Sequence, residues 1–388
     1  MREDAKSLLR RTLELACELI DADRVATAKR RQADMFAWRR SDYVPITFGA
    51  EVEALRHLPD FDWARQFAEP AVSLYMQMKD VIRASVGGSD YVPTVRADTG
   101  VINGPSILGA PFKVPAHTKP VISGHISKDR LAAFEVPDDI RGLGVIPTMV
   151  EHTQHHLAAL AEAGLADRVG VRHCDTQGPF DIAAQAYGHD EIFLGLYVDG
   201  DFVHELMAKC TDIYITLSRL SKQLAGHPIG QGYANEYWMD PGSVRLCDDS
   251  GILVSAEQYA EFLAPYLGKA FEPFGGGWIH YCGGIPDGNR PEGLHLHELY
   301  CAVPNMRGLN FTTGKDWPAE IGKVIASKVV YLGGLPRGED EPLDGYFRRV
   351  LSLCDGRRGM IFSASVRPDE LPAAMGTWHR LQDELWPN

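Results

Sequence analysis

The residues with the clearest chemical potential are a histidine and a cysteine two positions apart, in the run Ile279-His280-Tyr281-Cys282-Gly283-Gly284. Residues i and i+2 of a β-strand point to the same side, so His280 and Cys282 would project together. Imidazole nitrogen and thiolate sulfur are ligands that Zn²⁺ prefers. Two ligands do not complete a metal site, so the others must come from elsewhere in the chain.

Two further runs place carboxylates where a strand is expected to end. In Cys174-Asp175-Thr176-Gln177-Gly178-Pro179-Phe180-Asp181, residues Asp175 and Gln177 could orient a substrate or accept a proton, or cap a helix that begins near Pro179. In Leu246-Cys247-Asp248-Asp249-Ser250-Gly251, adjacent acids could bind a cation or share a proton. Neighbouring residues of a strand face opposite ways, so we expect at most one of the two acids to face the centre.

Histidines occur in two other groups. His152 and His156 are four residues apart and would share a helix face, but the segment lacks the glutamate of the H-E-x-x-H metalloprotease motif. We interpret it as a solvated helix face. His295 and His297 follow the His280–Cys282 segment directly, so one of them could complete a metal shell or contact substrate, unless both simply begin a polar helix.

The elements that would position these side chains alternate along the chain. Short apolar or β-branched runs, each ending in Gly, Asp, Asn or Ser, precede longer stretches of helical periodicity, which is typical of βα units and a parallel sheet. Eight such runs fit a closed (β/α)₈ barrel of the TIM type. They are residues 43–48, 91–97, 169–175, 244–248, 277–282, 308–312, 329–333 and 359–363.

Helices are predicted between these strands, for example over residues 147–163, 201–224 and 255–271. Residues 192–197 could form a ninth strand, but the acids just before them favour a helix. No G-x-G-x-x-G or Walker A loop follows a strand, so nothing supports a competing open, doubly wound sheet. We therefore predict an N-terminal helical segment over residues 1–40 and one α/β barrel domain over residues 41–388.

In such a barrel the reactive side chains lie at the C-terminal ends of the strands, because the βα loops meet there. This rule adds Asp98 and Asn310 to the candidates. The predicted catalytic residues are Asp175, Asp249 and His280, the predicted substrate-binding residues are Asp98, Gln177, Asn310 and His295, and the predicted metal ligands are His280 and Cys282.

Composition limits the function classes. The 388 residues include 39 Lys and Arg against 52 Asp and Glu, giving a net charge of −13 without any basic run, which argues against nucleic-acid binding. The seven cysteines form no C-x-x-C pair, so we expect a reducing, cytoplasmic location rather than a disulfide framework. The N-terminal stretch reads as an amphipathic surface helix, and neither a signal sequence nor a membrane span is predicted.

Four motifs in chain order resemble the uroporphyrinogen decarboxylase superfamily. The resemblance extends from Arg40 to the C-terminus, and H-x-C-G is its specific element. Within the superfamily the sequence is closer to the zinc-dependent methyltransferases that move a methyl group between a corrinoid protein and a thiol such as coenzyme M. The motifs are Val44-Pro45-Ile46, Gly178-Pro179-Phe180, the run Asp248-Asp249-Ser250-Gly251 followed by Val254-Ser255-Ala256-Glu257-Gln258-Tyr259, and His280-Tyr281-Cys282-Gly283.

This resemblance implies a (β/α)₈ barrel with its site at the C-terminal mouth, in which zinc bound to His280 and Cys282 lowers the pKa of a thiol for attack on a methyl group. The chain departs from the methyltransferases at residues 361–366, which contain no cysteine to act as another ligand, and at residues 312–314, which lack an expected acid. Cys174, Cys247, Asp249, His295 or another carboxylate could compensate, or the metal could be absent.

The function expected from these observations is transfer of a methyl or small alkyl group to or from a small-molecule substrate, with a corrinoid protein as partner. A metal-independent decarboxylase or lyase acting on a non-porphyrin substrate is the first alternative, with Asp98, Asp175 or His280 handling protons. A non-catalytic ligand-binding barrel is the second. A homodimer is compatible with each of these readings.

Overall fold

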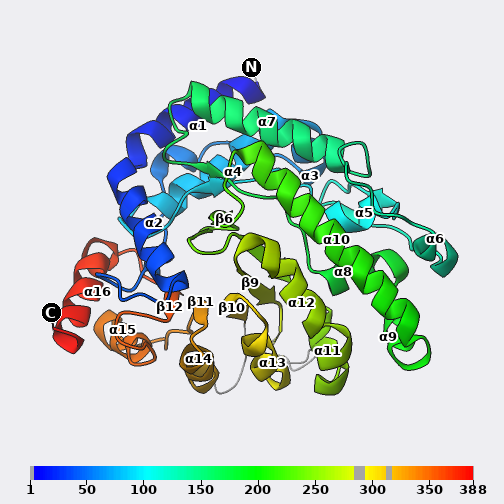
Figure 1. Cartoon of the computed structure of the whole chain (residues 1–388). Coiled ribbons are helices and arrows are strands. Elements are labelled where there is room, and N and C mark those ends of the chain that lie inside the picture. The colour runs from blue at the N-terminus through cyan, green and yellow to red at the C-terminus, as the bar shows by residue number, and fades with distance from the viewer. Residues whose placement is uncertain (1–3, 284–292, 312–316, 388) are drawn as a thin grey trace.

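A computed structural model describes residues 4–283, 293–311 and 317–387 (Figure 1). Its centre is a parallel sheet of six strands in the order β1-β12-β11-β10-β9-β8, and β2 (Thr94–Val95) pairs in parallel with β5 (Gly170–Val171) as a separate sheet. The strands of the larger sheet are β1 (Ile46–Thr47), β8 (Val244–Cys247), β9 (Gly277–Tyr281), β10 (Met306–Phe311), β11 (Val330–Gly334) and β12 (Met360–Ser363).

Each of the eight predicted runs overlaps one of these parallel strands, so the α/β class with a parallel sheet is confirmed. The predicted closure is not seen, because among the described residues no strand pairing joins β1 to β2 or β5 to β8. Pro45 and Pro93 precede the first two strands and have no N–H to donate, which limits pairing there. Other groups span the gaps: the Asp90 N–H donates to the Ile46 carbonyl at 2.7 Å, and Thr176 Oγ1 donates to the Arg245 carbonyl at 3.4 Å.

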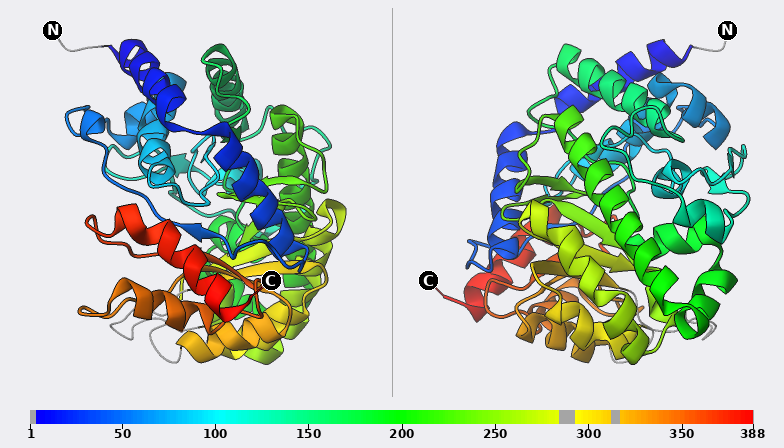
Figure 2. Two further views of the ribbon diagram at one scale, coloured as in Figure 1. Left: turned by 90° about the vertical axis from the view of Figure 1, so that its left-hand side faces the viewer. Right: turned by 45° about the vertical axis from the view of Figure 1, so that its right-hand side comes forward.

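Helices surround the strands in Figure 1, and Figure 2 shows the first, dark-blue helix at the end of the molecule opposite the yellow and orange helices. The described residues also form two antiparallel hairpins, β3 (Phe112–Lys113) with β4 (Val121–Ile122) and β6 (Gly232–Ala234) with β7 (Tyr237–Met239). The helices are α1 (Ala5–Leu19), α2 (Ala22–Phe36), α3 (Trp63–Ala68), α4 (Pro70–Ser85), α5 (Asn103–Ile107), α6 (Lys128–Ala132), α7 (Ile146–Glu162), α8 (Pro179–Tyr187), α9 (His189–Val198), α10 (Gly200–Ala225), α11 (Ala256–Phe262), α12 (Ala264–Phe271), α13 (His297–Ala302), α14 (Trp317–Ala326), α15 (Leu343–Leu351) and α16 (Leu371–Leu385).

Three helix predictions had different outcomes. Residues 192–197 lie in α9, as the preceding acids indicate. The helix predicted over residues 255–271 is interrupted at Leu263, because Pro265 supplies no N–H, and so α11 and α12 are separate. The interpretation of the His152–His156 face as solvated is wrong: both side chains are buried between α7 and its neighbours.

The two faces of the six-stranded sheet are covered differently. Ile279, Leu309 and Phe362 pack into the main core with the surrounding helices. On the other face, Trp278 packs with side chains of α2 and of the β6–β7 hairpin, and its indole N–H donates to the Ala234 carbonyl at 3.0 Å. His280 lies two residues beyond Trp278 on β9, so it shares that face and lies nearer the C-terminal edge.

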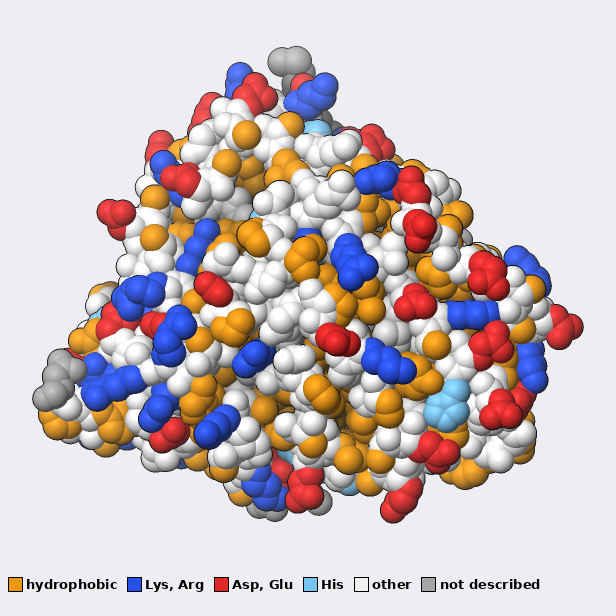
Figure 3. Space-filling view, viewed as in Figure 1, with side chains coloured by type: hydrophobic (Ala, Val, Ile, Leu, Met, Phe, Trp, Pro, Cys, Tyr) orange, Lys and Arg blue, Asp and Glu red, His pale blue; other side chains and the backbone are white. Residues whose placement is uncertain are grey.

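None of the described helices combines the length and the apolar character needed to cross a membrane. On the face of the molecule in Figure 3, Lys and Arg side chains are interspersed with Asp and Glu. This face therefore offers no extended basic surface, in agreement with the low count of basic residues.

Candidate metal site and its surroundings

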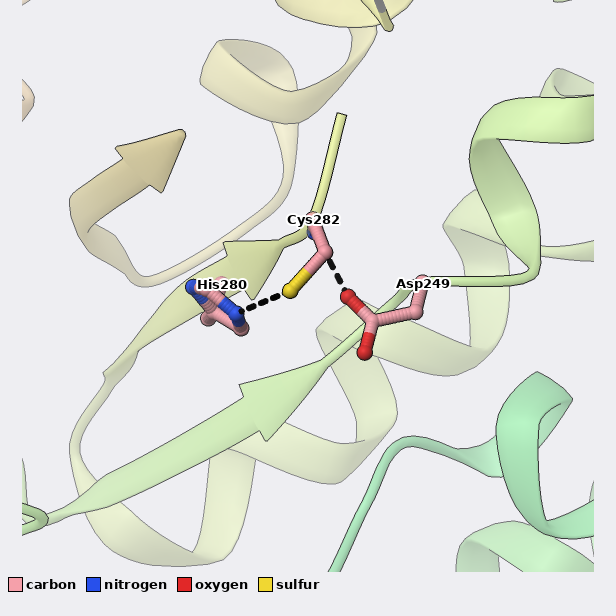
Figure 4. A group of neighbouring side chains, drawn as sticks. All are labelled: Asp249, His280 and Cys282. Atoms are coloured by element: carbon pink, nitrogen blue, oxygen red, sulfur yellow. Dashed lines mark hydrogen bonds between the residues drawn. The ribbon is translucent and has the colours of Figure 1, made fainter. Parts of the chain in front are cut away.

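Three metal-ligating side chains meet at the C-terminal edge of the sheet: Asp249, His280 and Cys282 (Figure 4). Asp249 lies two residues beyond the end of β8, and His280 and Cys282 lie at the end of β9. Because β8 and β9 are parallel neighbours, their carboxyl ends lie side by side. One ligand atom from each side chain lies within 4.8 Å of the other two, and His280 Nε2 is 3.0 Å from Cys282 Sγ.

Asn310 on β10 determines which nitrogen of His280 is free. The Asn310 amide nitrogen donates to the Leu332 carbonyl, so its Oδ1 faces His280 and accepts from Nδ1 at 2.5 Å. Nδ1 therefore carries the proton, and the lone pair of Nε2 points towards Cys282. Burial, with Arg245 nearby, lowers the pKa of His280, which favours the neutral ring that a metal requires.

Asp249 is fixed by contacts at both its backbone and its side chain. The Cys282 N–H donates to Asp249 Oδ1 at 2.6 Å, which holds the carboxylate beside Cys282. The Asp181 carboxylate on α8 accepts the N–H groups of Asp249 and Ser250 at 3.0 and 2.8 Å. These hydrogen bonds connect the ends of β8 and β9 to each other and to α8.

The chemistry of the three donors fits a catalytic zinc site. Such sites have three protein ligands from N, O and S atoms and an open position for water or substrate. With ordinary Zn–N and Zn–S bonds at a tetrahedral angle, the two ligand atoms would be about 3.5 Å apart, close to the separation of His280 Nε2 and Cys282 Sγ. Cys282 is exposed, while Asp249 and His280 are half-buried, so one side of the group is open.

Asp248 points away from this group, as alternation along a strand requires. Its Oδ2 accepts hydrogen bonds from the hydroxyls of Tyr259 and Tyr300 at 2.6 and 2.9 Å. Burial, together with nearby Asp181, raises the pKa of Asp248 to about 7. Burial and the charge of Asp249 raise the pKa of Asp181 to about 6. Only one of the two adjacent acids is therefore directed at the donors.

Asp175 and Asp98 are bound to basic side chains. Arg96 donates to Asp175 at 3.2 Å and to Asp98 at 3.1 Å, Arg245 donates to Asp175 at 3.3 Å, and Lys119 donates to Asp98 at 2.8 Å. Burial opposes ionisation, but Arg245 and Arg96 hold the pKa of Asp175 well below its usual range. In the same way, Arg96 and Lys119 outweigh burial and lower the pKa of Asp98 to about 2. Both acids therefore stay ionised.

A third arginine, Arg172, lies near Arg96 and has few partners for its buried charge. Arg172 follows β5, and its Nε and Nη1 atoms are buried without a hydrogen bond, although Nη1 lies 3.6 Å from Glu236. Burial, with Arg96 nearby, lowers the pKa of Arg172 to about 10. Arg245 stacks over Trp278 at 5.5 Å, which places it on the same face of the sheet as His280. The chain thus gathers guanidinium groups close to the candidate metal site.

The remaining candidates lie in other contacts. The Gln177 amide nitrogen donates to Asp175 Oδ1 at 2.7 Å, and His295 Nε2 lies 2.9 Å from the Val254 carbonyl, away from the three donors. Cys174 Sγ contacts Ser221 Oγ at 3.6 Å, and neither Cys174 nor Cys247 joins the described donor group. Residues 312–314 lie outside the described residues. Of the compensating ligands considered from sequence, Asp249 is therefore the one placed beside His280 and Cys282.

Sequence reasoning missed Asp181 as a contact of Asp249, and it missed Arg172 and Arg245. Asp181 falls in the helix predicted to begin near Pro179, and nothing in its own run shows which strand that helix faces. The two arginines could have been found by extending the i, i+2 rule backwards from Cys174 and Cys247.

No protein-family model matches the sequence, and no curated protein matches it. Among solved structures, a methyltransferase from Methanosarcina mazei is similar over 92% of this chain and 99% of its own, with a TM-score of 0.63 and 14% sequence identity. At that identity the similarity shows a shared fold. Membership of the uroporphyrinogen decarboxylase superfamily stays a prediction from the motifs.

Proposed function

We propose that this protein is a transferase of methyl or small alkyl groups in which Asp249, His280 and Cys282 hold a zinc ion that activates a substrate thiol. The observation that carries the proposal is the three-donor group at the C-terminal edge of the sheet, open on one side. We further propose that the eight strands form a TIM-type barrel with two interrupted seams. The shared fold with a methyltransferase supports both statements.

Zinc bound there would supply a Lewis acid that lowers the pKa of a coordinated thiol, so that a thiolate is present at neutral pH. The chain's own part is to hold the donors. Asn310 keeps the proton of His280 on Nδ1, and the Cys282 N–H orients the Asp249 carboxylate. One thiolate and one carboxylate would balance the two positive charges of the ion, and its open position could take a substrate sulfur.

The remaining predicted residues act on the substrate in this proposal. Asp175 and Asp98 remain ionised, so they position groups and balance charge rather than carry protons. We propose that the methyl group is exchanged with a corrinoid held by a partner protein, and that the substrate thiol enters from the exposed side of Cys282. A methylated corrinoid protein mixed with candidate thiols tests this partner by the change in corrinoid absorbance.

Metal analysis of the purified protein is the direct test of the metal site. We expect about one zinc per chain in the wild type, and a loss of most of it in Cys282→Ser and His280→Ala. Cys301→Ser, a half-buried cysteine on α13, is the matched control and should keep its zinc. Equal zinc in wild type and Cys282→Ser, or none in either, would overturn the zinc role.

Metal-independent decarboxylation is the second candidate function, favoured by the guanidinium groups of Arg96, Arg172 and Arg245. These could bind the carboxylates of a substrate through paired hydrogen bonds. His280 Nε2 would then serve as the proton acceptor or donor, since Asp98 and Asp175 stay ionised. Release of carbon dioxide from a carboxylate substrate by metal-stripped protein would support this function over the first.

A further inference from the structure

Asp181 makes contacts that neither its sequence motif nor the proposed reaction explains. It is on the first turn of α8, is 1% exposed, and directs both carboxylate oxygens at successive backbone N–H groups of the turn after β8. Those N–H groups belong to Asp249, one of the three candidate ligands, and to Ser250. An acid in the first turn of a helix is also favoured by the helix dipole, which partly offsets the cost of burying this carboxylate.

Two residues at the start of α8, Gly178 and Pro179, allow this helix to pack closely against β8. A Cβ atom at Gly178 would lie 2.1 Å from the Cys247 carbonyl oxygen, so any other residue would push the helix away from the strand. Pro179 then begins the helix, where its missing N–H costs nothing. Glycine and proline thus bring Asp181 within hydrogen-bond distance of the turn.

The same turn is linked to the other ligands. Asp249 Oδ1 accepts the Cys282 N–H, so a shift of the Asp249 backbone would also change the position of its carboxylate relative to Cys282 and His280. On the opposite side of the group, Asn310 orients His280. Each strand end that carries a ligand is therefore held by a side chain from another element.

We propose that Asp181 is a positioning residue for the metal site, whose carboxylate fixes the turn that presents Asp249 to the ion. This inference rests on the proposed zinc site. Groups that hold metal ligands in place commonly contribute ten- to a hundredfold to metal affinity. The described hydrogen bonds of the Asp181 carboxylate go to the backbone N–H groups of Asp249 and Ser250, so Asp181 would hold the turn through its backbone.

The variant Asp181→Asn tests the role with little change in shape. Its amide keeps one acceptor but turns an N–H₂ group towards the second backbone N–H, so the turn can no longer be held by both. We expect zinc affinity, measured by competition with a chromogenic chelator, to fall about ten- to a hundredfold. Asp190→Asn, an exposed acid on α9, is the control and should bind zinc like the wild type.

Two readouts separate positioning from a general loss of structure. With cobalt in place of zinc, the visible spectrum of Asp181→Asn should approach that of Asp249→Asn while the thiolate charge-transfer band of Cys282 remains. In the Asp249→Asn background, Asp181→Asn should weaken metal binding little further, because the two residues act through one ligand. If Asp181→Asn does not fold, Asp181→Thr, whose hydroxyl can accept one N–H, replaces it in the same measurements.

The possible outcomes distinguish this inference from the proposed function. Wild-type protein that binds no zinc would overturn the metal site and the positioning role together. Wild-type protein that binds zinc, with unchanged affinity and an unchanged cobalt spectrum in Asp181→Asn, would overturn the positioning role alone. An equal loss of affinity with and without Asp249 would also overturn it, since the effect would then not pass through that ligand.

Discussion

At the scale of single residues, the chemistry of the site depends on which nitrogen of His280 carries the proton. Asn310 decides this, because its amide is oriented by the Leu332 carbonyl and presents oxygen to Nδ1. An amide that both positions a histidine and fixes its tautomer serves a metal ligand better than it serves a general base, since the base must exchange its proton.

We expect Asn310→Ala to lower zinc affinity about ten- to a hundredfold, because the ring of His280 loses its orientation and its preferred tautomer. Competition with a chelator measures this affinity, and Gln223→Ala, at the exposed end of α10, is the control. If Asn310 only contacts substrate, zinc affinity will be unchanged while the Michaelis constant rises.

Asp175 illustrates a residue whose environment limits its role. It accepts from Arg96 and Arg245, and both guanidinium groups are largely buried. Removing one member of a buried ion pair leaves the partner uncompensated, which commonly costs about 3–5 kcal/mol. We therefore expect Asp175→Asn to lower the free energy of unfolding by about this amount, measured by urea denaturation.

The matched control for Asp175→Asn is Asp190→Asn, which removes an exposed carboxylate from α9. It should change the free energy of unfolding by less than about 0.5 kcal/mol. Full stability of Asp175→Asn would contradict our account, because the buried ion pairs with Arg96 and Arg245 would then contribute nothing to the free energy of unfolding.

At the scale of elements, the sequence predicts the features that follow from a pattern of residues within one short segment. The apolar runs predicted all eight parallel strands, and the spacing of His280 and Cys282 predicted their common side. What could not be predicted depends on contacts between distant segments. The position of Asp181 against β8 is one example, and the lack of pairing between β1 and β2 and between β5 and β8 in the described part of the chain is another. Neither leaves a period or a motif in its own stretch of chain.

The histidines of α7 are buried by the elements that pack against this helix, and burial lowers the pKa of their side chains. Sequence suggested a solvated face, but His152 and His156 are 1% and 0% exposed, and neither nitrogen of His156 has a hydrogen-bond partner among the described residues. Burial, with His152 and His155 nearby, lowers the pKa of His156 from 6.5 to about 3. The helix therefore packs well only while these rings are neutral.

This burial predicts a specific pH dependence of stability. His156 is neutral in the folded chain and titrates near pH 6.5 when unfolded, so its contribution is fully present above pH 6.5 and is lost as the pH falls towards 3. Between pH 7 and 5 the free energy of unfolding should fall by about 2 kcal/mol on account of this residue. Urea denaturation at the two pH values measures the fall.

In His156→Gln the fall between pH 7 and 5 should be smaller by that amount, even though the variant is less stable at both values. His117→Gln is the control, because that side chain is exposed. An equal fall in wild type and His156→Gln would mean that His156 is already protonated or solvated in the folded protein.

At the scale of the whole molecule, α2 closes the end of the strand assembly opposite the candidate site. Met35 and Phe36 pack with Trp278, Leu332 and Ile361 on the face of the sheet that carries His280. Through Arg31, α2 also connects the segment before β2 to β1, two strands that do not pair with each other in the described residues. Arg31 donates to the buried Asp90 at 2.7 Å, and Asp90 in turn bonds to the backbone of β1.

These contacts predict that residues 1–40, although distinct in sequence, cannot be removed from the rest of the chain. Without these residues, the apolar face around Trp278 is exposed to water and the buried Asp90 loses its ion pair with Arg31. Each of these losses lowers the free energy of unfolding by several kcal/mol. The total stability of a protein is only about 5–15 kcal/mol. We expect residues 41–388 alone to aggregate or to unfold without a cooperative transition, as judged by gel filtration and thermal circular dichroism. In the full chain, Phe36→Ala should cost about 3–5 kcal/mol in the free energy of unfolding. The half-buried Phe61, just before α3, is the control, and Phe61→Ala should cost less. A shortened chain that unfolds cooperatively and binds zinc like the full protein would show that the strand assembly is stable without α2.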